Sequence, residues 1–339
     1  MRDRYLIVGP CAAESREQVV ETASRLVTVI GDRIAVSGLI FRAGVWKPRT
    51  RPDTFQGVGE EGLGWLQEVK ERFGIPVATE VATPDHVREA LFAGIDYLWI
   101  GARTSANPIA VQEIADTIQQ TTRTPKGIII KNPVNADAGL WLGNIARLEA
   151  TGVPVIAVHR GCNHQPCWAM AHQVRLARPD IPMLLDPSHM SGDAAKVPVL
   201  MEKVRELGLD GAMVEVHCDP KEALSDAKQQ IAPSQMSAAL PLNDEMSATK
   251  SLNDVELNWL RAEIDELDET LWDTIAARME VSKRIGEWKK AHGVAPLQPE
   301  RYQTIVERIN ELTNERGLST DFALRIWEII HEQSLNEQY

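Results

Sequence analysis

Eight short runs of apolar and β-branched residues recur through the first two thirds of the chain, with amphipathic segments between them. The runs span residues 6–8, 34–41, 75–81, 97–100, 127–130, 154–158, 181–185 and 212–216. Short apolar strands that alternate with helices are typical of βαβ units, whose parallel strands are buried on both faces. Because eight such units follow one another, we expect a (β/α)₈ barrel rather than an open doubly wound sheet. No GxGxxG or GxxxxGK[ST] loop follows any of the runs, which argues against nucleotide binding.

Composition narrows the class of protein further. The chain has 339 residues, of which 44% are hydrophobic and 25% charged, as in globular proteins. It has no apolar run of about 18 residues that would span a membrane, and its first residues do not resemble a signal peptide. We therefore expect a cytoplasmic protein whose four cysteines stay reduced. The net charge of −12 argues against nucleic acid or an anionic membrane as a partner.

The pattern divides the chain into a barrel over residues 1–230, a linker over 231–250 and a helical domain over 251–339. Pro, Ser and Ala replace periodic apolar residues in the linker. Beyond it, helical spacing predicts one helix of about 35–40 residues that begins at Asn253 or Asp254, then two shorter helices. Three helices of unequal length cannot cover the apolar face of the first, so we expect at least a homodimer.

A polar or charged residue stands at or just after the end of nearly every predicted strand. In chain order these residues are Cys11, Arg42, Glu80, Arg103, Lys131, Arg160, His189 and Glu215, followed by Asp226. The C-terminal ends of all strands of a (β/α)₈ barrel meet at one mouth, where catalysis takes place. We therefore expect these side chains to form one active site.

The residues at the predicted mouth fall into two chemical groups. Six cations suit a substrate with phosphate and carboxylate groups, namely Arg42, Lys47, Arg49, Arg103, Lys131 and Arg160. The mixed thiolate, imidazole and carboxylate set of Cys11, His189, Glu215 and Asp226 suits a divalent transition metal rather than Mg²⁺. We expect Mn²⁺, with Fe²⁺, Co²⁺ or Zn²⁺ as alternatives. The spacing His159-x-x-Cys162-x-His164-x-x-Cys167 leaves a compact zinc site open as a rival.

Several motifs of the barrel resemble 3-deoxy-D-arabino-heptulosonate 7-phosphate (DAHP) synthase of type Iβ. They are Gly9-Pro10-Cys11-Ala12-Ala13-Glu14, Arg42-Ala43-Gly44, Lys47-Pro48-Arg49-Thr50, Thr79-Glu80-Val81, Gly101-Ala102-Arg103, His159-Arg160-Gly161, Asp186-Pro187-Ser188-His189, Glu215-Val216-His217 and Leu224-Ser225-Asp226. The deciding motif is Lys47-Pro48-Arg49-Thr50. Octulosonate-phosphate synthases share the Gly-Pro-Cys start but lack this motif, and they remain the alternative.

The resemblance implies condensation of phosphoenolpyruvate with erythrose 4-phosphate, the first step of the shikimate pathway. It implies that Arg103 and Lys131 hold the phosphate of phosphoenolpyruvate. Its carboxylate would be bound by Arg42 and Arg160 together with Lys131.

For erythrose 4-phosphate, the resemblance implies that Arg49 and Thr50 bind the phosphate, with Lys47 between the two substrates. The metal would polarise the aldehyde oxygen as a Lewis acid. Glu80 would order a water molecule or a cation. Lys47, Glu80 and the metal ligand His189 are thus the expected catalytic residues of the barrel.

The helical domain resembles the all-α class of chorismate mutase, which rearranges chorismate to prephenate without a covalent intermediate. The matching residues are Leu260-Arg261, Arg278, Gly286-x-x-Lys289, Arg301 and His331-Glu332-x-Ser334-x-x-x-Gln338. Arg278, Ser282 and Lys289 fall within about 40° of one helix face, and Ser334 and Gln338 share a face of the last helix.

The resemblance implies that arginines bind the two carboxylates of chorismate and that Lys289 and Gln338 stabilise the breaking ether oxygen. Arg278, Lys289 and Gln338 would be catalytic, and Arg261 would come from the other subunit. The implied substrate-binding set is Arg261, Arg278, Ser282, Lys289, Gln298, Arg301, Ser334 and Gln338.

Two positions depart from the commoner mutase pattern. Gln298 stands where an Asp is frequent, and Tyr302 stands where a Glu usually binds the substrate hydroxyl. The alternative is therefore a helical domain that senses a ligand or forms the dimer without catalysis. We also expect prephenate or chorismate bound in this domain to inhibit the barrel.

Overall fold

The computed structural model describes residues 4–30, 38–48, 53–239, 252–295 and 297–338. The chain forms two compact units, Met1–Glu263 and Ile264–Tyr339. All described strands belong to the first unit, and the described part of the second unit is helical.

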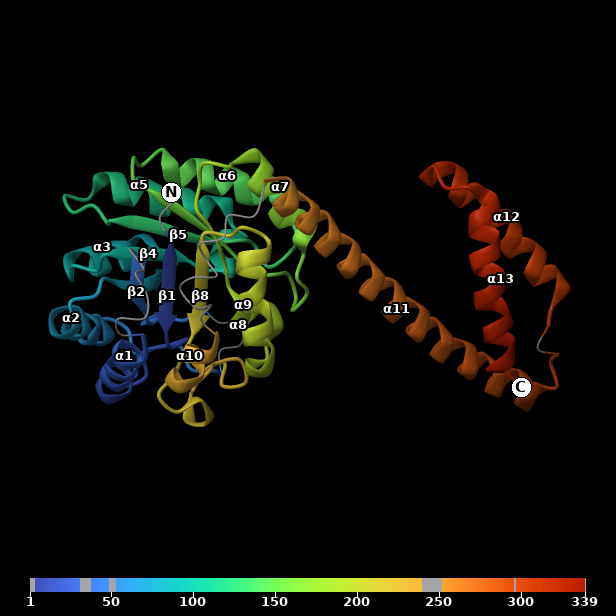
Figure 1. Ribbon diagram of the computed structural model, residues 1–339, viewed down its shortest axis with the longest axis horizontal. Helices are drawn as coiled ribbons and strands as arrows, with labels where there is room; N and C mark the ends of the chain where they lie inside the picture. The colour runs from blue at the N-terminus through green and yellow to red at the C-terminus, as the bar shows by residue number, and fades with distance from the viewer. Residues whose placement is uncertain (1–3, 31–37, 49–52, 240–251, 296, 339) are drawn as a thin grey trace. The chain divides into compact units, whose positions relative to one another are not determined.

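The first unit contains a closed barrel of eight parallel strands in sequence order, coloured blue to yellow in Figure 1. The strands are β1 Tyr5–Gly9, β2 Gly38–Arg42, β3 Val77–Val81, β4 Tyr97–Ile100, β5 Gly127–Lys131, β6 Val155–His159, β7 Met183–Leu185 and β8 Gly211–Glu215. Pairing of β1 with β8 closes the sheet. The predicted (β/α)₈ barrel is therefore confirmed.

Helices surround this sheet. They are α1 Arg16–Ile30, α2 Glu61–Phe73, α3 Pro84–Phe92, α4 Ala102–Ser105, α5 Pro108–Gln120, α6 Ala138–Glu149, α7 Trp168–Ala177, α8 Pro187–Ser191, α9 Val197–Glu206 and α10 Pro233–Ala239. Two 3₁₀ turns, η2 Ala194–Lys196 and η3 Pro220–Glu222, complete the described elements of the barrel.

Apolar side chains fill the barrel in two layers. On β1, Ile7 belongs to the cluster inside the barrel, whereas Leu6 and Val8 belong to the layer between the strands and the helices. This alternation follows from the two-residue period of a strand. The inner cluster consists of Ile7, Ile40, Ala78, Trp99, Ile129, Ile156, Val158, Leu184 and Met213. The interior is therefore a packed core, and the polar residues at the strand ends lie at its rim.

The segment predicted as a linker begins as part of the barrel. Ile231 forms a β-bridge with Val216, and its backbone N–H donates to the carbonyl oxygen of Glu215 at 3.0 Å. Residues 233–239 then form α10, which packs against α1. The linker prediction is therefore wrong over residues 231–239, because composition does not reveal a bridge to a strand far away in sequence. Residues 240–250 lie outside the described residues.

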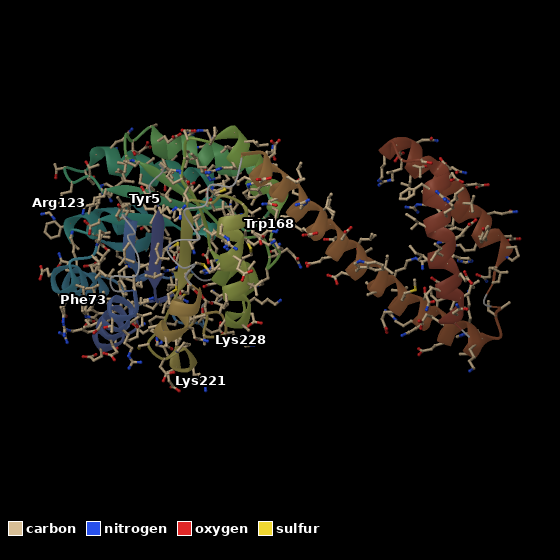
Figure 2. All side chains as sticks on the ribbon, viewed as in Figure 1. Tyr5, Phe73, Arg123, Trp168, Lys221 and Lys228 are labelled. Atoms are coloured by element: carbon tan, nitrogen blue, oxygen red, sulfur yellow. The ribbon has the colours of Figure 1, made fainter. Side chains whose placement is uncertain are left out.

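The three helices at the C-terminus are α11 Leu252–His292, α12 Pro299–Arg316 and α13 Thr320–Asn336. α11 begins at Leu252, so the predicted caps Asn253 and Asp254 lie inside the helix. The first residues of α11 belong to the barrel unit, because Trp259 contacts α7 at Trp168, a residue labelled in Figure 2. None of the helices described here combines the length and the apolar character needed to cross a membrane.

Candidate active sites

A cavity of about 450 Å³ lies at the C-terminal ends of the barrel strands. Eight of the predicted site residues line it, namely Arg42, Lys47, Glu80, Arg103, Lys131, Arg160, His189 and Asp226. Cys11 and Glu215 are fully buried just after β1 and at the end of β8. Arg49 and Thr50 lie outside the described residues. The strand ends thus bring nearly all predicted side chains of the barrel to one place.

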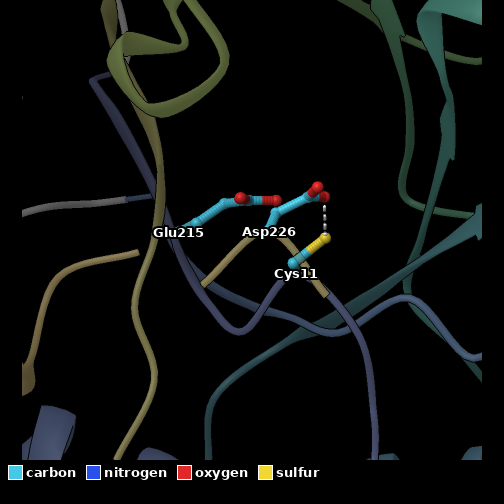
Figure 3. A group of neighbouring side chains, drawn as sticks. All are labelled: Cys11, Glu215 and Asp226. Carbon is cyan, nitrogen blue, oxygen red and sulfur yellow. Dashed lines mark hydrogen bonds between the residues drawn. The ribbon is translucent and has the colours of Figure 1, made fainter. Parts of the chain in front are cut away.

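Three of the four predicted metal ligands form a cluster (Figure 3). One ligand atom from each of Cys11, Glu215 and Asp226 lies within 4.8 Å of the others, and the Cys11 Sγ donates to Asp226 Oδ2 at 2.8 Å. The fourth, His189, places its Nε2 3.5 Å from Glu215 Oε1. This donor set of a thiol, an imidazole and two carboxylates fits a divalent transition metal.

The charges around the cluster act on the Cys11 thiol. Burial raises the pKa of the Cys11 thiol far above its usual range, and the negative charges of Glu215 and Asp226 raise it further. A divalent cation bound there would reverse this effect, because coordination deprotonates a thiol. Asp226 also has a left-handed backbone, with φ of 51°, which is strained for a residue other than glycine.

Side-chain amides hold the metal-ligand candidates in place. The Gln230 Oε1 accepts the backbone N–H of Cys11 at 3.0 Å, and Gln229 Nε2 donates to Glu215 Oε2 at 2.7 Å. Ser188 Oγ accepts the backbone N–H of Glu215. The sequence patterns did not single out Gln229 or Gln230, because an amide carries no charge and their role depends on packing after β8.

Arg42 lines the cavity and is almost completely buried. Its Nη2 donates to Glu215 Oε1 at 3.1 Å, and its guanidinium lies 4.5 Å from the ring centroid of Trp99. Its Nε and Nη1 are buried without a hydrogen-bond partner among the described residues. Because an unpaired buried donor is costly, these two atoms are suited to an anionic ligand.

Asp186, which begins α8 as its N-cap, organises the neighbouring side of the cavity. Its Oδ2 accepts from Lys131 Nζ at 2.6 Å and lies 2.9 Å from His189 Nδ1. Burial alone would raise the pKa of Asp186, but the charges of His189 and Lys131 hold it well below the usual range. We did not predict a role for Asp186, although it stands in the quoted motif three residues before His189.

Lys47 and Glu80 both line the cavity and form an ion pair. Lys47 Nζ lies 3.5 Å from Glu80 Oε2 and donates to the carbonyl oxygen of Cys11 at 3.0 Å. Burial lowers the pKa of Lys47, but the nearby negative charges outweigh it, and the pKa lies above its ordinary value. Gly101 makes room for Glu80, since a Cβ on Gly101 would lie 2.0 Å from Glu80 Oε1.

Arg103 and Arg160 supply further positive charge to the cavity. Arg103 lies on the short helix α4, directly after β4. The backbone N–H of Arg160, directly after β6, donates to Asn132 Oδ1 at 2.7 Å. Asn163 and His164 also line the cavity, and no sequence pattern places them in the substrate site.

The rival zinc motif does not assemble. His159 Nε2 lies 2.6 Å from the carbonyl oxygen of Pro166 and is therefore engaged as a donor. Within the part of the chain that the structure describes, no three of His159, Cys162, His164 and Cys167 bring ligand atoms within 4.8 Å of one another. The loop is compact because Cys162 pairs with Gln165 through two backbone hydrogen bonds.

In the helical unit, residues of α11 contact α13 and the turn after it, which brings together two pairs of predicted residues. Ser334 lies on α13, whereas Gln338 lies in the turn after Asn336 and not on the last helix as predicted. Arg278 Nη1 donates to Ser334 Oγ, and Lys289 Nζ donates to Gln338 Oε1 at 3.0 Å. Gly286 permits this approach, because a Cβ there would lie 2.7 Å from Cα of Gln338. The Lys289–Gln338 pair therefore depends on a glycine about one turn before Lys289.

The other predicted site residues of the C-terminal helices are Ser282, Arg301, Gln298 and Arg261. Ser282 is buried on α11, whereas Arg301 is exposed on α12. Gln298 is the N-cap of α12 but makes no capping hydrogen bond through its side chain. Arg261 is exposed on the part of α11 that belongs to the barrel unit.

Two family models match the chain. The DAHP synthetase I family model matches residues 2–251, and the chorismate mutase type II model matches residues 260–339. The first match covers the barrel and α10, and the second begins within α11.

Known proteins are similar to the barrel part. The phospho-2-dehydro-3-deoxyheptonate aldolase of Thermotoga maritima is 30% identical over 234 residues, which are 67% of this chain and 64% of that protein. The 2-dehydro-3-deoxyphosphooctonate aldolase of Stenotrophomonas maltophilia strain R551-3 is 30% identical over 267 residues, 72% of this chain and 91% of that protein. The match to the Thermotoga protein thus spans less than two thirds of its length.

A solved structure agrees with this placement. The crystal structure of DAHP synthase from Thermotoga maritima has a TM-score of 0.59 and 27% identity, and the match covers 70% of this chain and 67% of that one. The two family models together match both the barrel and the C-terminal helices. The chain therefore belongs to the DAHP synthetase I family and carries a type II chorismate mutase domain after its barrel.

Proposed function

We propose that the barrel condenses phosphoenolpyruvate with erythrose 4-phosphate to give DAHP and inorganic phosphate. The observation that carries this proposal is the cavity, in which Arg42, Lys47, Arg103, Lys131 and Arg160 surround a cluster suited to a metal. Five cations at one mouth of a protein with net charge −12 match two substrates that both carry phosphate.

Phosphoenolpyruvate would lie with its carboxylate on Arg42 and Arg160, together with Lys131. Its phosphate would lie on Arg103 and Lys131. Asp186 keeps Lys131 oriented, and Trp99 supports the guanidinium of Arg42 from one face. These fixed donors would orient the enol carbon before the reaction and reduce its entropic cost.

In the reaction, C3 of phosphoenolpyruvate forms a bond to the aldehyde carbon of erythrose 4-phosphate. Water adds to C2, and cleavage of the C2–O bond releases phosphate, which balances the atoms of substrates and products. Lys47 would donate a proton to the new alkoxide, and Glu80, 3.5 Å from Lys47 Nζ, would orient the water.

Cys11, His189, Glu215 and Asp226 would hold the divalent metal of the barrel. When bound, the metal supplies Lewis acidity to the aldehyde oxygen. We propose Mn²⁺, with Fe²⁺, Co²⁺ or Zn²⁺ as alternatives, because a site with one thiolate accepts several of these ions.

Arg49 and Thr50 would bind the phosphate of erythrose 4-phosphate. The alternative is an octulosonate-phosphate synthase, which would use arabinose 5-phosphate instead, and similarity to the Stenotrophomonas protein keeps this alternative in view. The motif Lys47-Pro48-Arg49-Thr50 favours erythrose 4-phosphate. Phosphate release with each aldehyde, measured on the full chain, separates the two, and faster turnover of arabinose 5-phosphate would reject our proposal.

We propose that the helical part rearranges chorismate to prephenate. The observation that carries this is the pair of hydrogen bonds Arg278–Ser334 and Lys289–Gln338. Arg278 would bind a carboxylate, and Lys289 with Gln338 would stabilise charge on the breaking ether oxygen. Ser282, Gln298, Arg301 and Ser334 would complete the substrate contacts. Loss of chorismate absorbance on addition of the full chain is the direct assay, and no turnover would favour the ligand-sensing alternative.

We also propose that the chain forms at least a homodimer through its C-terminal helices, with Arg261 supplied to the other subunit's pocket. Large apolar side chains on α11 and α13 are exposed in one copy, namely Ile264, Leu267, Leu271, Trp272, Val281, Ile285, Trp288, Phe322, Ile326 and Ile329. A surface of this kind is typical of an interface. Sedimentation of the full chain measures the oligomeric state, and a monomer would contradict the proposal.

We propose that the protein is cytoplasmic. Its barrel would catalyse the first step of aromatic biosynthesis, and its helical part would catalyse a later step of the same pathway. We also propose that prephenate or chorismate, bound by the helical part, inhibits the barrel. Linkage then requires that barrel substrates change the affinity for that ligand. Condensation rates measured against added prephenate, in the wild type and in Arg278→Ala, test this, and equal sensitivity would reject it.

A further inference from the structure

His331 lies on the same side of α13 as Ser334 of the proposed mutase pocket. It precedes Ser334 by three residues, so the two side chains lie about 60° apart around the helix, and Gln338 follows just after the helix ends at Asn336. Ser334 and Gln338 contact Arg278 and Lys289 of α11. His331 therefore extends the row of polar side chains that faces these two cations.

Two aromatic rings fix the position of the His331 imidazole. It stacks on Trp327, with 4.8 Å between the ring centroids, and it meets the edge of Tyr302 of α12 at 5.4 Å. Tyr302 also contacts Trp327, at 4.9 Å. Three mutual contacts leave the imidazole little freedom to rotate, so its nitrogen atoms point in defined directions.

One nitrogen of this imidazole lacks a partner. His331 Nε2 is buried and has no hydrogen bond to any described residue. Buried polar atoms are nearly always paired with protein, water or a ligand. Because the charges of Arg278 and Lys289 also act on this imidazole, its unpaired nitrogen is a candidate for contact with a molecule bound to these cations.

The surroundings disfavour protonation of this imidazole. Burial lowers the pKa of His331, and the positive charges of Arg278 and Lys289, which face it from α11, lower it further. Tyr302 is the titratable group that contacts it from α12. A neutral imidazole offers one nitrogen as a hydrogen-bond acceptor, whereas an imidazolium offers none.

The ring hydroxyl of chorismate needs a hydrogen-bond acceptor, which the cationic residues of the pocket cannot provide. The two carboxylates and the ether oxygen of chorismate call for donors, which Arg278, Lys289 and Gln338 provide. Its ring hydroxyl carries a proton that needs an acceptor. The residue after Arg301, where a carboxylate would serve, is Tyr302, and the tyrosine packs on His331.

We propose that His331 is a substrate-binding residue of the helical part and that its Nε2 accepts the hydrogen bond of the ring hydroxyl of chorismate. This inference rests on the mutase function proposed above. The His331 imidazole, packed against Tyr302 and Trp327, would thus make the pocket specific for a ring that carries a hydroxyl group.

Kinetics of the full-length chain with two substrates test the proposal. The substrates are chorismate and an analogue in which hydrogen replaces the ring hydroxyl. The variants are His331→Leu, which removes the acceptor, and His331→Gln, which keeps one. His292→Gln is the matched control, because His292 also stacks on a tryptophan of the same unit, Trp288, at 4.1 Å.

For His331→Leu we expect kcat/KM with chorismate to fall roughly ten- to a hundred-fold, the size of a lost buried hydrogen bond. We expect no change beyond about two-fold with the deoxy analogue, since that substrate never made the bond. His331→Gln should recover part of the loss, and His292→Gln should match the wild type. An equal loss on both substrates would overturn the proposal, because it would indicate a structural role alone.

The pH profile gives a second readout. In the wild type, kcat/KM should fall as pH drops through the lowered pKa of His331, since protonation removes the acceptor; this acid limb should be absent in His331→Gln. A limb that persists unchanged would contradict the assignment. A wild-type chain that neither binds nor converts chorismate would reject the mutase function itself, whereas an active wild type with unaffected His331 variants would reject this inference alone.

Discussion

Trp259, near the start of α11, donates its indole N–H to the carbonyl oxygen of Leu207, just after α9, at 3.0 Å. Its ring stacks on His172 of α7 with 5.2 Å between centroids, and His172 Nδ1 contacts Glu263. The beginning of α11 therefore belongs to the outer layer of the barrel, although the chorismate mutase model already matches from residue 260.

The first prediction concerns this anchor. Trp259 is 2% exposed, so Trp259→Ala should lower the free energy of unfolding of the barrel by about 3–5 kcal/mol through loss of packing and of the indole hydrogen bond. Urea unfolding of the full chain, followed by circular dichroism, measures it. Phe92→Ala is the control, because Phe92 is 80% exposed on α3 of the same unit. Equal effects of the two substitutions would show that Trp259 does not anchor α11.

The second prediction concerns the metal. Cys11→Ser should reduce the metal content of the purified protein and abolish condensation, because the thiol is a proposed ligand in a cluster with Glu215 and Asp226. Elemental analysis gives the metal content, and Cys218→Ser is the matched control away from the cluster. Chelation of the wild type should have the same effect as the substitution. Full activity after exhaustive chelation would reject the metal site.

The third prediction separates the two substrates of the barrel. Arg103→Ala should chiefly raise KM for phosphoenolpyruvate, whereas Arg49→Ala should chiefly raise KM for erythrose 4-phosphate. Loss of a charged phosphate contact should cost about 1.5–3 kcal/mol, or roughly ten- to a hundred-fold in kcat/KM. Steady-state kinetics with each substrate varied in turn distinguish them. The same shift for both substrates in either variant would contradict the assigned subsites.

The fourth prediction concerns acid stability. Burial lowers the pKa of His159 to about 4, against an ordinary value of 6.5, so the unfolded chain takes up a proton at a higher pH than the folded one. Stability due to neutral His159 is therefore full above pH 6.5 and declines as pH falls toward 4, by up to roughly 3 kcal/mol.

Urea unfolding at several pH values checks this. His159→Gln should flatten the loss of stability between pH 6.5 and 4, even if it lowers stability at neutral pH. His164→Gln is the control, because His164 is exposed in the loop that follows β6. An unchanged pH dependence in His159→Gln would show that other groups cause the loss.

The fifth prediction concerns the mutase pocket. Arg261→Ala and Lys289→Ala should each remove most mutase activity, at least ten-fold by loss of a charged contact, without loss of helicity. If Arg261 serves the pocket of a second copy, a mixed dimer can assemble one intact pocket. Mixing the two inactive proteins under subunit exchange should then restore some activity. No recovery despite proven exchange would place Arg261 in the pocket of its own chain.

The sequence alone determined the barrel and the composition of its mouth. Each strand is a local apolar run, and the ends of parallel strands in a closed barrel meet at one rim, so Arg42, Lys131 and Glu215 were predictable together. The helical register on α11 likewise indicated that Arg278, Ser282 and Lys289 share a face. Period and spacing are properties of neighbouring residues, which is why they can be read along the chain.

Tertiary structure decided what depends on contacts between distant segments. Asp186 holds Lys131 across 55 positions of sequence, and Trp259 bonds to Leu207 across 52. The residues of α10 look like a linker by composition, yet they pack against α1. No local pattern encodes these partners, because burial and long-range hydrogen bonds exist only once the barrel has closed. The sequence thus determined which chemical groups the mouth contains, and the packing decided which of them hold one another in place.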